Sequence, residues 1–233
     1  MKTAHQIVLC ILLTLVFSNS SAQSLDWLIS TTEGDAVFSD VVVDDLNQKV
    51  YAVGTFRGNN VGAYQFVSAS NPTNLGSSNS FSNGDEIAVL VAFNLDGELL
   101  WEAASADNTS CGFTSVDVLP NGSIVVGGYH QTSFEIQGTS GSAIIPNLDG
   151  NGRLDAFFAV YDQNGAFLHA EAFGGDGDDM VTALAVSSDG FLVSTMSDGD
   201  ADDFSASNLE DDHVYRLCKY DLDYNLQWSF SAA

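Results

Sequence analysis

Positively charged residues are scarce in this chain. Of its 233 residues, six are Lys or Arg and 31 are Asp or Glu, so the formal net charge at pH 7 is −25. A surface of this sign repels a phosphate backbone, which argues against nucleic acid as a partner. The acidic surplus is typical of a device for solubility in an exported protein, and it also supplies the oxygen ligands that Ca²⁺ takes.

Cysteines and long apolar runs are scarce as well. The chain has three cysteines, of which Cys10 lies inside the apolar run of residues 7–17. Cys111 and Cys218 could form one disulfide, but two lone cysteines in a β protein are more often independent buried thiols. No later run reaches the roughly 18 apolar residues of a membrane-spanning helix, so we expect no membrane span.

Residues 1–22 have the features of a secretory signal peptide. Lys2 precedes the apolar run, and small residues end at Ala22, before the expected cleavage ahead of Gln23. The run itself is too short to cross a bilayer. We therefore expect an exported protein, secreted or held at the cell surface, with a mature chain of residues 23–233.

The rest of the chain shows no 3.6-residue apolar period, and instead one pattern of short strands and turns occurs three times. The strands are rich in Val, Ile, Tyr and Phe, and Asn-Gly or Asp-Gly pairs fill most of the tight turns. The first and second strands are predicted at 38–44 with 49–56, 113–119 with 123–129, and 180–186 with 191–196. The third and fourth are predicted at 91–94 with 98–101, 159–162 with 166–169, and 218–221 with 225–228. The mature chain is therefore predicted to be all-β.

Four antiparallel strands, repeated about every 60–75 residues, match the blade of a β-propeller. The three units span roughly 32–105, 106–173 and 174–231, and residues 25–31 align with one extra fourth strand. A β-sandwich is the alternative, but it would not require the same pattern three times. Propellers close with about four to eight blades, so three units predict an incomplete propeller. Either the chain is a fragment with further blades in the same gene product, or another chain covers its end blades.

A family resemblance rests on the third unit. Phe173-Gly-Gly-Asp-Gly-Asp-Asp179, a strand, Ser188-Asp-Gly190 and a second strand resemble the bacterial β-propeller repeat called SBBP, as does the segment 155–162. The resemblance covers nearly all of 26–231 and is degraded in the first two units. It implies a repeat module of a secreted or cell-surface protein. The shorter phrase at 95–102 resembles the repeat of quinoprotein propellers.

Because successive strands run in opposite directions, the connections between them lie alternately at the two ends of the sheets, which we call the two rims. Tight turns fall on one rim, and the long segments 57–84, 131–154 and 198–211 fall on the other. Since function concentrates in loops held by a rigid scaffold, we expect a functional face on the rim with the long segments.

Two acidic loops on this rim are candidates for Ca²⁺, the only cofactor that the sequence suggests. The first places oxygen side chains at positions 1, 3, 5 and 9 and Gly152 at position 6, as in an EF-hand loop, but Phe158 stands where that loop has Glu. The second is an Asp-rich turn whose carboxylates could instead cap backbone N–H groups. A polar hairpin loop is likewise the alternative for the first. The candidate metal ligands are Asn147, Asp149, Asn151 and Asp155, then Asp176, Asp178 and Asp179.

Catalysis finds little support in the sequence. His130 and His213 lack metal-ligand spacing, and no Gly-x-Ser-x-Gly elbow occurs. Our hypothesis is an exported, non-enzymatic β-propeller module that contacts protein or glycan at the bacterial cell surface and is stabilised by Ca²⁺. The alternative is part of an enzyme propeller, either a quinoprotein-like oxidoreductase or a polysaccharide-active enzyme.

Overall fold

The computed structural model describes residues 29–31, 35–57, 62–63, 66–68, 80–81, 86–106, 110–148, 153–174, 177–198 and 213–232. Their regular secondary structure is β-strand. In this part of the chain no helix is long and apolar enough to cross a membrane. The predicted signal peptide, residues 1–22, lies outside the described residues.

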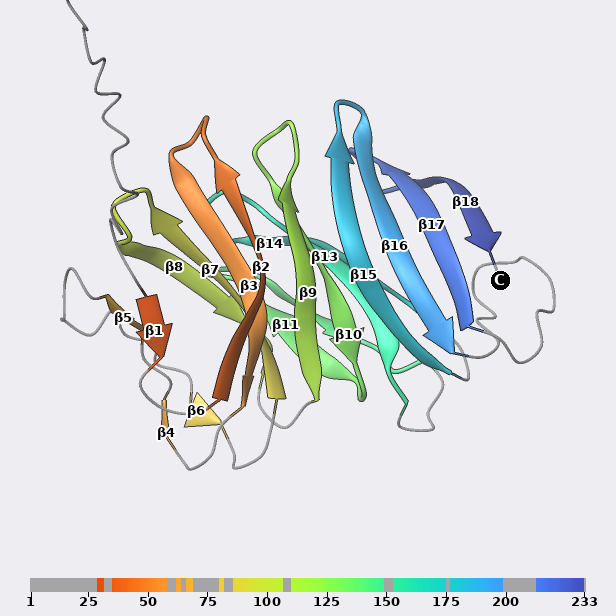
Figure 1. Ribbon diagram of the computed structural model, residues 1–233, viewed down its shortest axis with the longest axis horizontal. Helices are drawn as coiled ribbons and strands as arrows, with labels where there is room; N and C mark the ends of the chain where they lie inside the picture. The colour runs from red at the N-terminus through yellow and green to blue at the C-terminus, as the bar shows by residue number, and fades with distance from the viewer. Residues whose placement is uncertain are drawn as a thin grey trace, which may run out of the picture.

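Three four-stranded antiparallel sheets form the body of the structure (Figure 1), as the sequence predicts. Blade 1 consists of β2 (Asp35–Asp44), β3 (Lys49–Arg57), β7 (Glu86–Asn94) and β8 (Leu99–Ala104). Blade 2 consists of β9 (Cys111–Val118), β10 (Ile124–His130), β13 (Asp155–Tyr161) and β14 (Phe167–Phe173). Blade 3 consists of β15 (Asp178–Ser187), β16 (Gly190–Asp198), β17 (His213–Asp221) and β18 (Leu226–Ala232). Within each sheet the strands follow one another in chain order, which is the connectivity of a propeller blade.

The short segments outside the blades form three small sheets. Residues 25–31 are predicted to form an extra fourth strand, but the described part of them, β1 (Ile29–Thr31), pairs with β5 (Phe66–Ser68) in a two-stranded sheet and joins no blade. The second pair is β4 (Gly62–Ala63) with β6 (Ser80–Phe81). The third is the hairpin of β11 (Phe134–Gln137) and β12 (Ser142–Ile145). That hairpin contacts β8 and β14 and fills the outer part of the wedge between blades 1 and 2.

The repeat extends to irregularities that the strand pattern alone does not show. Each first strand carries a β-bulge, and the extra residue is a hydroxyl residue: Ser39, Thr114 or Thr182. The turn between third and fourth strands also repeats. A side-chain oxygen of Asn94, Asp162 or Asp221 accepts backbone N–H groups two and four residues later. The backbone then passes through a positive φ at Gly97, Gly165 and Tyr224.

The first strand of each blade is a sheet edge whose outward N–H groups have no partner in their own sheet. In blades 2 and 3, side chains of the preceding blade accept hydrogen bonds from three of these groups. The Asp40 carboxylate accepts the N–H of Val116 at 3.0 Å. One blade further on, Ser115 Oγ accepts the N–H of Leu184 at 3.1 Å, and the Asp117 carboxylate accepts that of Val186 at 2.9 Å. The inner strands β2, β9 and β15 therefore lie side by side (Figure 1).

At the outer edge, the fourth strand of one blade packs on the third turn of the next. Trp101 donates its indole N–H to the carbonyl of Gln163 and lies against Gly165, where a Cβ atom would come within 2.7 Å of the indole ring. At the corresponding place between blades 2 and 3, His169 stacks on Tyr224 with ring centroids 4.8 Å apart. The large Trp faces glycine and the smaller His faces Tyr. Each interface thus places a ring of the fourth strand on the following turn, and the larger ring lies on the turn that has no side chain.

Gly165 offers a test of this packing. Its φ of 81° disfavours any Cβ, and Trp101 already occupies the space. Gly165→Ala is expected to lower the free energy of unfolding by about 2–5 kcal/mol, the sum of a left-handed backbone penalty and an overpacking penalty. Chemical denaturation followed by circular dichroism measures it.

Gly122→Ala is the matched control. Gly122 has a φ of 83°, but a Cβ there would meet only an amide nitrogen of Asn47, at 3.5 Å. Its cost is therefore expected to be the backbone penalty alone, about 1–2 kcal/mol. Equal losses in the two variants would contradict the proposed contact between Trp101 and Gly165.

Candidate functional site

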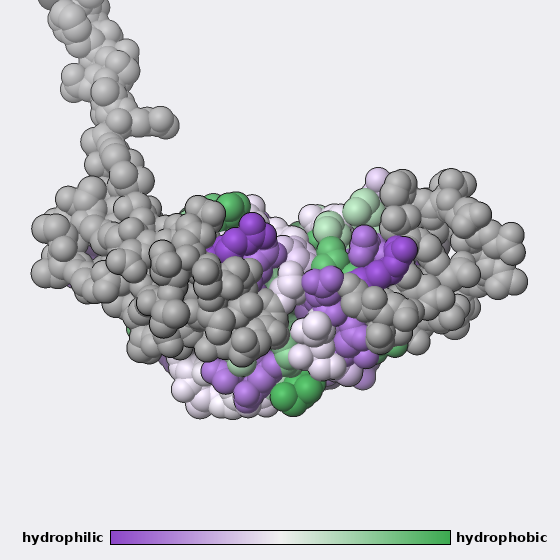
Figure 2. Space-filling model, turned by 90° about the horizontal axis from the view of Figure 1, so that it is seen from below, coloured by the Kyte–Doolittle hydropathy of each residue, from purple (hydrophilic) through white to green (hydrophobic). Residues whose placement is uncertain are grey.

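The strand ends from which the long connections leave lie at one rim of the three blades, as predicted from strand direction. In Figure 1 the turns between first and second strands lie at the top, and the ends of the second strands and the starts of the third strands lie at the bottom. Figure 2 looks onto the lower rim, where much of the described surface is hydrophilic, with small hydrophobic areas between.

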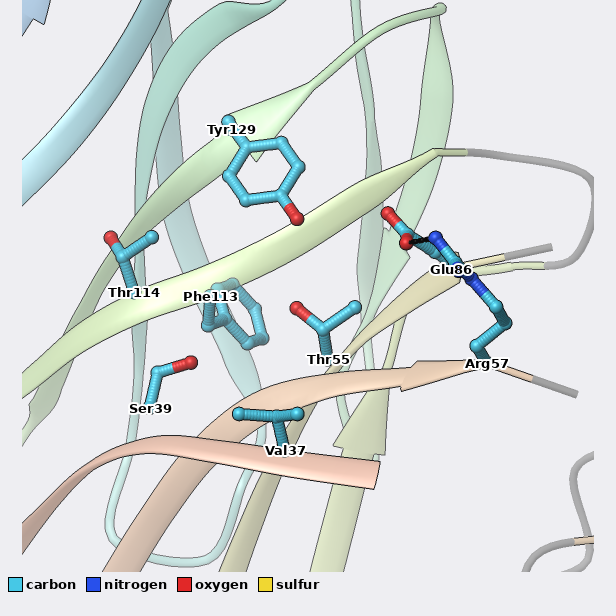
Figure 3. A pocket seen from close by; sticks show the side chains of 8 residues that line it. All are labelled: Val37, Ser39, Thr55, Arg57, Glu86, Phe113, Thr114 and Tyr129. Atoms are coloured by element: carbon cyan, nitrogen blue, oxygen red, sulfur yellow. Dashed lines mark hydrogen bonds and ion pairs between the residues drawn. The ribbon is translucent and has the colours of Figure 1, made fainter. Parts of the chain in front are cut away.

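A pocket of about 360 Å³ opens between blades 1 and 2 near this rim (Figure 3). Blade 1 contributes residues of β2, β3 and the start of β7, and blade 2 contributes residues of β9 and β10. The lining residues are Val37, Ser39, Thr55, Arg57, Glu86, Phe113, Thr114 and Tyr129. The volume lies within the range of small-ligand pockets, roughly 300–1,000 Å³.

Side-chain size differs between the two interfaces beside this pocket. Between blades 2 and 3, Val181 packs directly on Gly127, where an added Cβ would lie 2.4 Å from a Val181 methyl. The corresponding positions between blades 1 and 2 hold the larger pair Val53 and Phe113, both fully buried in one apolar cluster. The bulge residues Ser39 and Thr114 both line the pocket (Figure 3).

The polar groups of the pocket are arranged in two pairs. Arg57 and Glu86 are cross-strand neighbours and form an ion pair, with side chains 52% and 20% exposed. Glu86 also accepts a long hydrogen bond of 3.5 Å from Ser110 Oγ. Deeper in the pocket Tyr129 is hydrogen-bonded to Thr55, and burial raises the pKa of the Tyr129 phenol. Gly112 leaves room for both side chains, since a Cβ there would lie 2.2 Å from Thr55 Oγ1.

The two predicted metal loops meet at one place between blades 2 and 3. Asp155 is fully buried and Asp179 is 3% exposed. An oxygen of each carboxylate points at Gly174, at 2.5 Å and 3.0 Å from the position that a Cβ would occupy. The main chains join as well, since the N–H of Asp179 donates to the carbonyl of Leu154. Asp149, Asn151 and Asp176 lie outside the described residues.

Several of these carboxylates have structural hydrogen bonds. Asp155 Oδ2 accepts from the N–H of Leu148 at 2.8 Å and from the Asn147 amide at 3.3 Å, which ties the start of the first loop to β13. Asp178 Oδ1 accepts from the N–H of Leu154 at 3.1 Å. Asp179 faces the buried Arg216. Burial lowers the pKa of that guanidinium, and the Asp179 charge acts in the opposite direction.

The two mature cysteines are buried free thiols, as expected of lone cysteines in a β protein. Burial raises the pKa of Cys218 to about 11, so its thiol is protonated at neutral pH and is a poor nucleophile. Among the described residues, no group of three or more His, Cys, Asp or Glu side chains could hold a metal ion.

The pocket residues were not predicted from the sequence. Arg57 is one of only six basic residues, and it stands at the end of a predicted second strand, at the rim where function was expected. The scarcity of basic residues was the feature of the sequence that could have drawn attention to Arg57. Its partner Glu86 is 29 positions away across a long insertion, and nothing local in the sequence indicates the pairing.

The three successive four-stranded antiparallel sheets place this chain in the class of proteins built from β-propeller-type blades. A ligand-sized pocket lies between two of these blades. No known family profile matches the chain, and no curated protein matches it. Among solved structures, the chain is similar to Raptor of Chaetomium thermophilum, with 13% identity and a TM-score of 0.24, over 89% of this chain and 22% of that one. The fold assignment rests on the strand order and register described above.

The electrostatic interaction between Asp179 and Arg216 generates a stability prediction. Both side chains are buried, so Asp179→Asn removes a negative charge that stabilises the charged Arg216 guanidinium, and breaking a buried ion pair costs about 3–5 kcal/mol. We expect a loss of this size in urea denaturation with EDTA present. Asp223→Asn, at an exposed turn position, is the control and should change the stability by less than about 0.5 kcal/mol. A loss no larger than that of the control would contradict the pairing.

Proposed function

We propose that the chain is an exported, non-enzymatic β-propeller repeat module of the SBBP type, which contacts protein or glycan at the bacterial cell surface. The signal peptide of residues 1–22 supports export, and the Asp-rich phrase at 173–179 supports the repeat type. The observation that carries the contact role is the difference between the two end faces of the array.

The third strand of the end face is covered on blade 1 and open on blade 3. On blade 1, Ile87, Val89 and Val91 of β7 have no exposed surface, although Val41 and Val43 of β2, on the same face, are 60% and 53% exposed. On blade 3, Tyr215, Trp228 and Phe230 are 55%, 47% and 63% exposed. Alternation places them on the side opposite to Cys218 and Tyr220, which face blade 2.

The open face also differs in charge from the rest of the molecule. In the middle of β16, β17 and β18 the residues on it are Leu192, Ser194, Met196, Tyr215, Leu217, Lys219, Trp228 and Phe230. None of these eight is acidic, although the chain has 31 Asp and Glu residues, and Asp221 shares their alternation only at the end of β17. A largely apolar patch on so acidic a protein is typical of a contact surface.

A further blade of the same gene product is the partner that we propose for this face. Trp228 occupies the position of Trp101, which lies against Gly165 of the following blade, so a blade with glycine at that turn would fit. The inner strand of blade 3 has Ala183 where blade 1 has Asp40 and blade 2 has Ser115. Because an alanine side chain cannot accept a hydrogen bond from the next blade, the contact is expected to depend on the apolar residues of β17 and β18.

Appending a copy of residues 106–173 after Ala233 tests this proposal, because that segment already accommodates Trp101. Acrylamide quenching of Trp228, obtained by difference from a Trp228→Phe variant, is expected to fall several-fold in the fusion. The matched control carries Gly165→Tyr in the appended copy only, which fills the space that Trp228 needs. Equal quenching in the fusion and its control would refute the contact.

Calcium is the second part of the proposal. The point beside Gly174 where the carboxylates of Asp155 and Asp179 converge would hold the ion, and oxygen ligands suit Ca²⁺. The ion would lower the repulsion between two buried carboxylates, while Arg216 balances part of the remaining charge. Its role would be to join blades 2 and 3.

Thermal denaturation with and without millimolar CaCl₂ tests the metal. Ca²⁺ is expected to raise the Tm of the wild-type chain by several degrees, in proportion to RT ln(1 + [Ca²⁺]/Kd). In Gly174→Ala the added methyl group would occupy the ion's position and remove the shift. No Ca²⁺-dependent shift in the wild type, or an undiminished shift in Gly174→Ala, would exclude this site.

A further inference from the structure

The pocket between blades 1 and 2 has the chemistry of a saccharide site. We propose that it binds one residue of a neutral saccharide, which deepens the proposed contact function by naming a ligand class and a place for it. The inference rests on that proposed function for its biological setting, but its chemical argument comes from the lining residues alone.

Access and depth suit a small ligand. Arg57 and Glu86 are partly exposed and stand at the strand ends near the rim, whereas Phe113 is fully buried and forms part of the inner wall (Figure 3). A ligand would therefore pass a polar mouth and meet an aromatic ring. Polar groups at fixed positions over an apolar wall are the usual composition of a small-molecule site.

The charges favour a neutral ligand. Glu86 is the only acidic residue of the lining, and its charge is balanced by Arg57. An anionic ligand would have to approach a chain of net charge −25 and would compete with Glu86 for the guanidinium. A cationic ligand would compete with Arg57 for Glu86. A neutral ligand could accept hydrogen bonds from Arg57 and donate to Glu86 while that pair stays intact.

The hydroxyl groups favour a ligand that carries hydroxyls itself. Ser39, Thr55 and Tyr129 each offer a hydroxyl that both donates and accepts, whereas the Thr114 hydroxyl is bonded to the carbonyl of Gly127. A purely apolar ligand would displace water from these groups and leave hydrogen bonds unmade, at about 1–3 kcal/mol each. A pyranose combines hydroxyls around its edge with an apolar C–H face, and Val37 and Phe113 supply the apolar contact for that face.

At the neighbouring interface the equivalent hydroxyl groups are engaged in hydrogen bonds. There Thr114 Oγ1 is hydrogen-bonded to the carbonyl of Gly127 and also contacts the carbonyl of Val181, so blades 2 and 3 approach closely. The third bulge residue, Thr182, is exposed and bonds to Ser194 of its own blade. Blade 3 therefore supplies a hydroxyl of the same origin that lies outside the pocket and serves as an internal control.

The probes are free glucose, galactose, mannose and N-acetylglucosamine, their common disaccharides, and glucuronate as an anionic comparison. Binding to the full mature chain is followed by NMR line broadening of the sugars and by isothermal titration calorimetry. We expect at least one neutral sugar to bind, and glucuronate to bind more weakly. Thr55→Val and Tyr129→Phe each delete one pocket hydroxyl with little change of shape. Each is expected to weaken binding about 5–10-fold, the usual effect of losing one hydrogen bond.

Thr182→Val is the control and should leave the affinity unchanged. Sugar binding that is equal in all three variants would overturn the assignment of the pocket while leaving glycan contact in place. Tighter binding of glucuronate than of every neutral sugar would overturn the ligand class. If no sugar binds, the inference fails, whereas the contact surface on blade 3 is judged separately by Trp228 quenching in the extended chain.

Discussion

The unpaired edge of each sheet is the constraint on which this structure depends. A blade begins with an edge strand whose N–H groups would otherwise be left without acceptors against the neighbouring sheet, and such groups are costly to bury. Asp40, Ser115 and Asp117 supply the missing acceptors from the preceding blade. Part of the acidic surplus is therefore structural: it fixes the height at which one blade lies against the next, and the apolar faces then meet in register.

Given that alignment, the blades differ in the size of the side chains that meet between them. Gly127 lets Val181 approach to direct contact, whereas the larger Val53 and Phe113 stand at the corresponding positions between blades 1 and 2. The β11–β12 hairpin fills the outer part of the same wedge, so the space remains only near the inner strands and the rim. The pocket is thus a consequence of packing between repeats that are similar in topology but differ in side-chain size.

The blades could be predicted from the sequence because their signals are local. Strand periodicity and the Asn-Gly and Asp-Gly turns act over a few residues, and Gly97, Gly165 and Gly122 adopt the positive φ that such turns require. The pairing of β1 with β5 and the ion pair of Arg57 with Glu86 join residues separated by long insertions, which no local pattern encodes. The two acidic loops were identified as separate candidates. Their meeting at Gly174 depends on how blades 2 and 3 pack, which the sequence does not display.

At one interface Trp101 lies on Gly165, and at the next His169 lies on Tyr224. These pairings limit how such an array can grow by gene duplication. The matched partners belong to different sheets, so a gene duplication that copied one sheet alone would separate them and juxtapose Trp with Tyr, or His with Gly. A duplication whose ends fall between that turn and the fourth strand carries a fourth strand together with the turn of its neighbour, and every copy then brings its own compatible contact. The segment that such a duplication would copy is therefore offset by one strand from the four-stranded sheet that forms a blade.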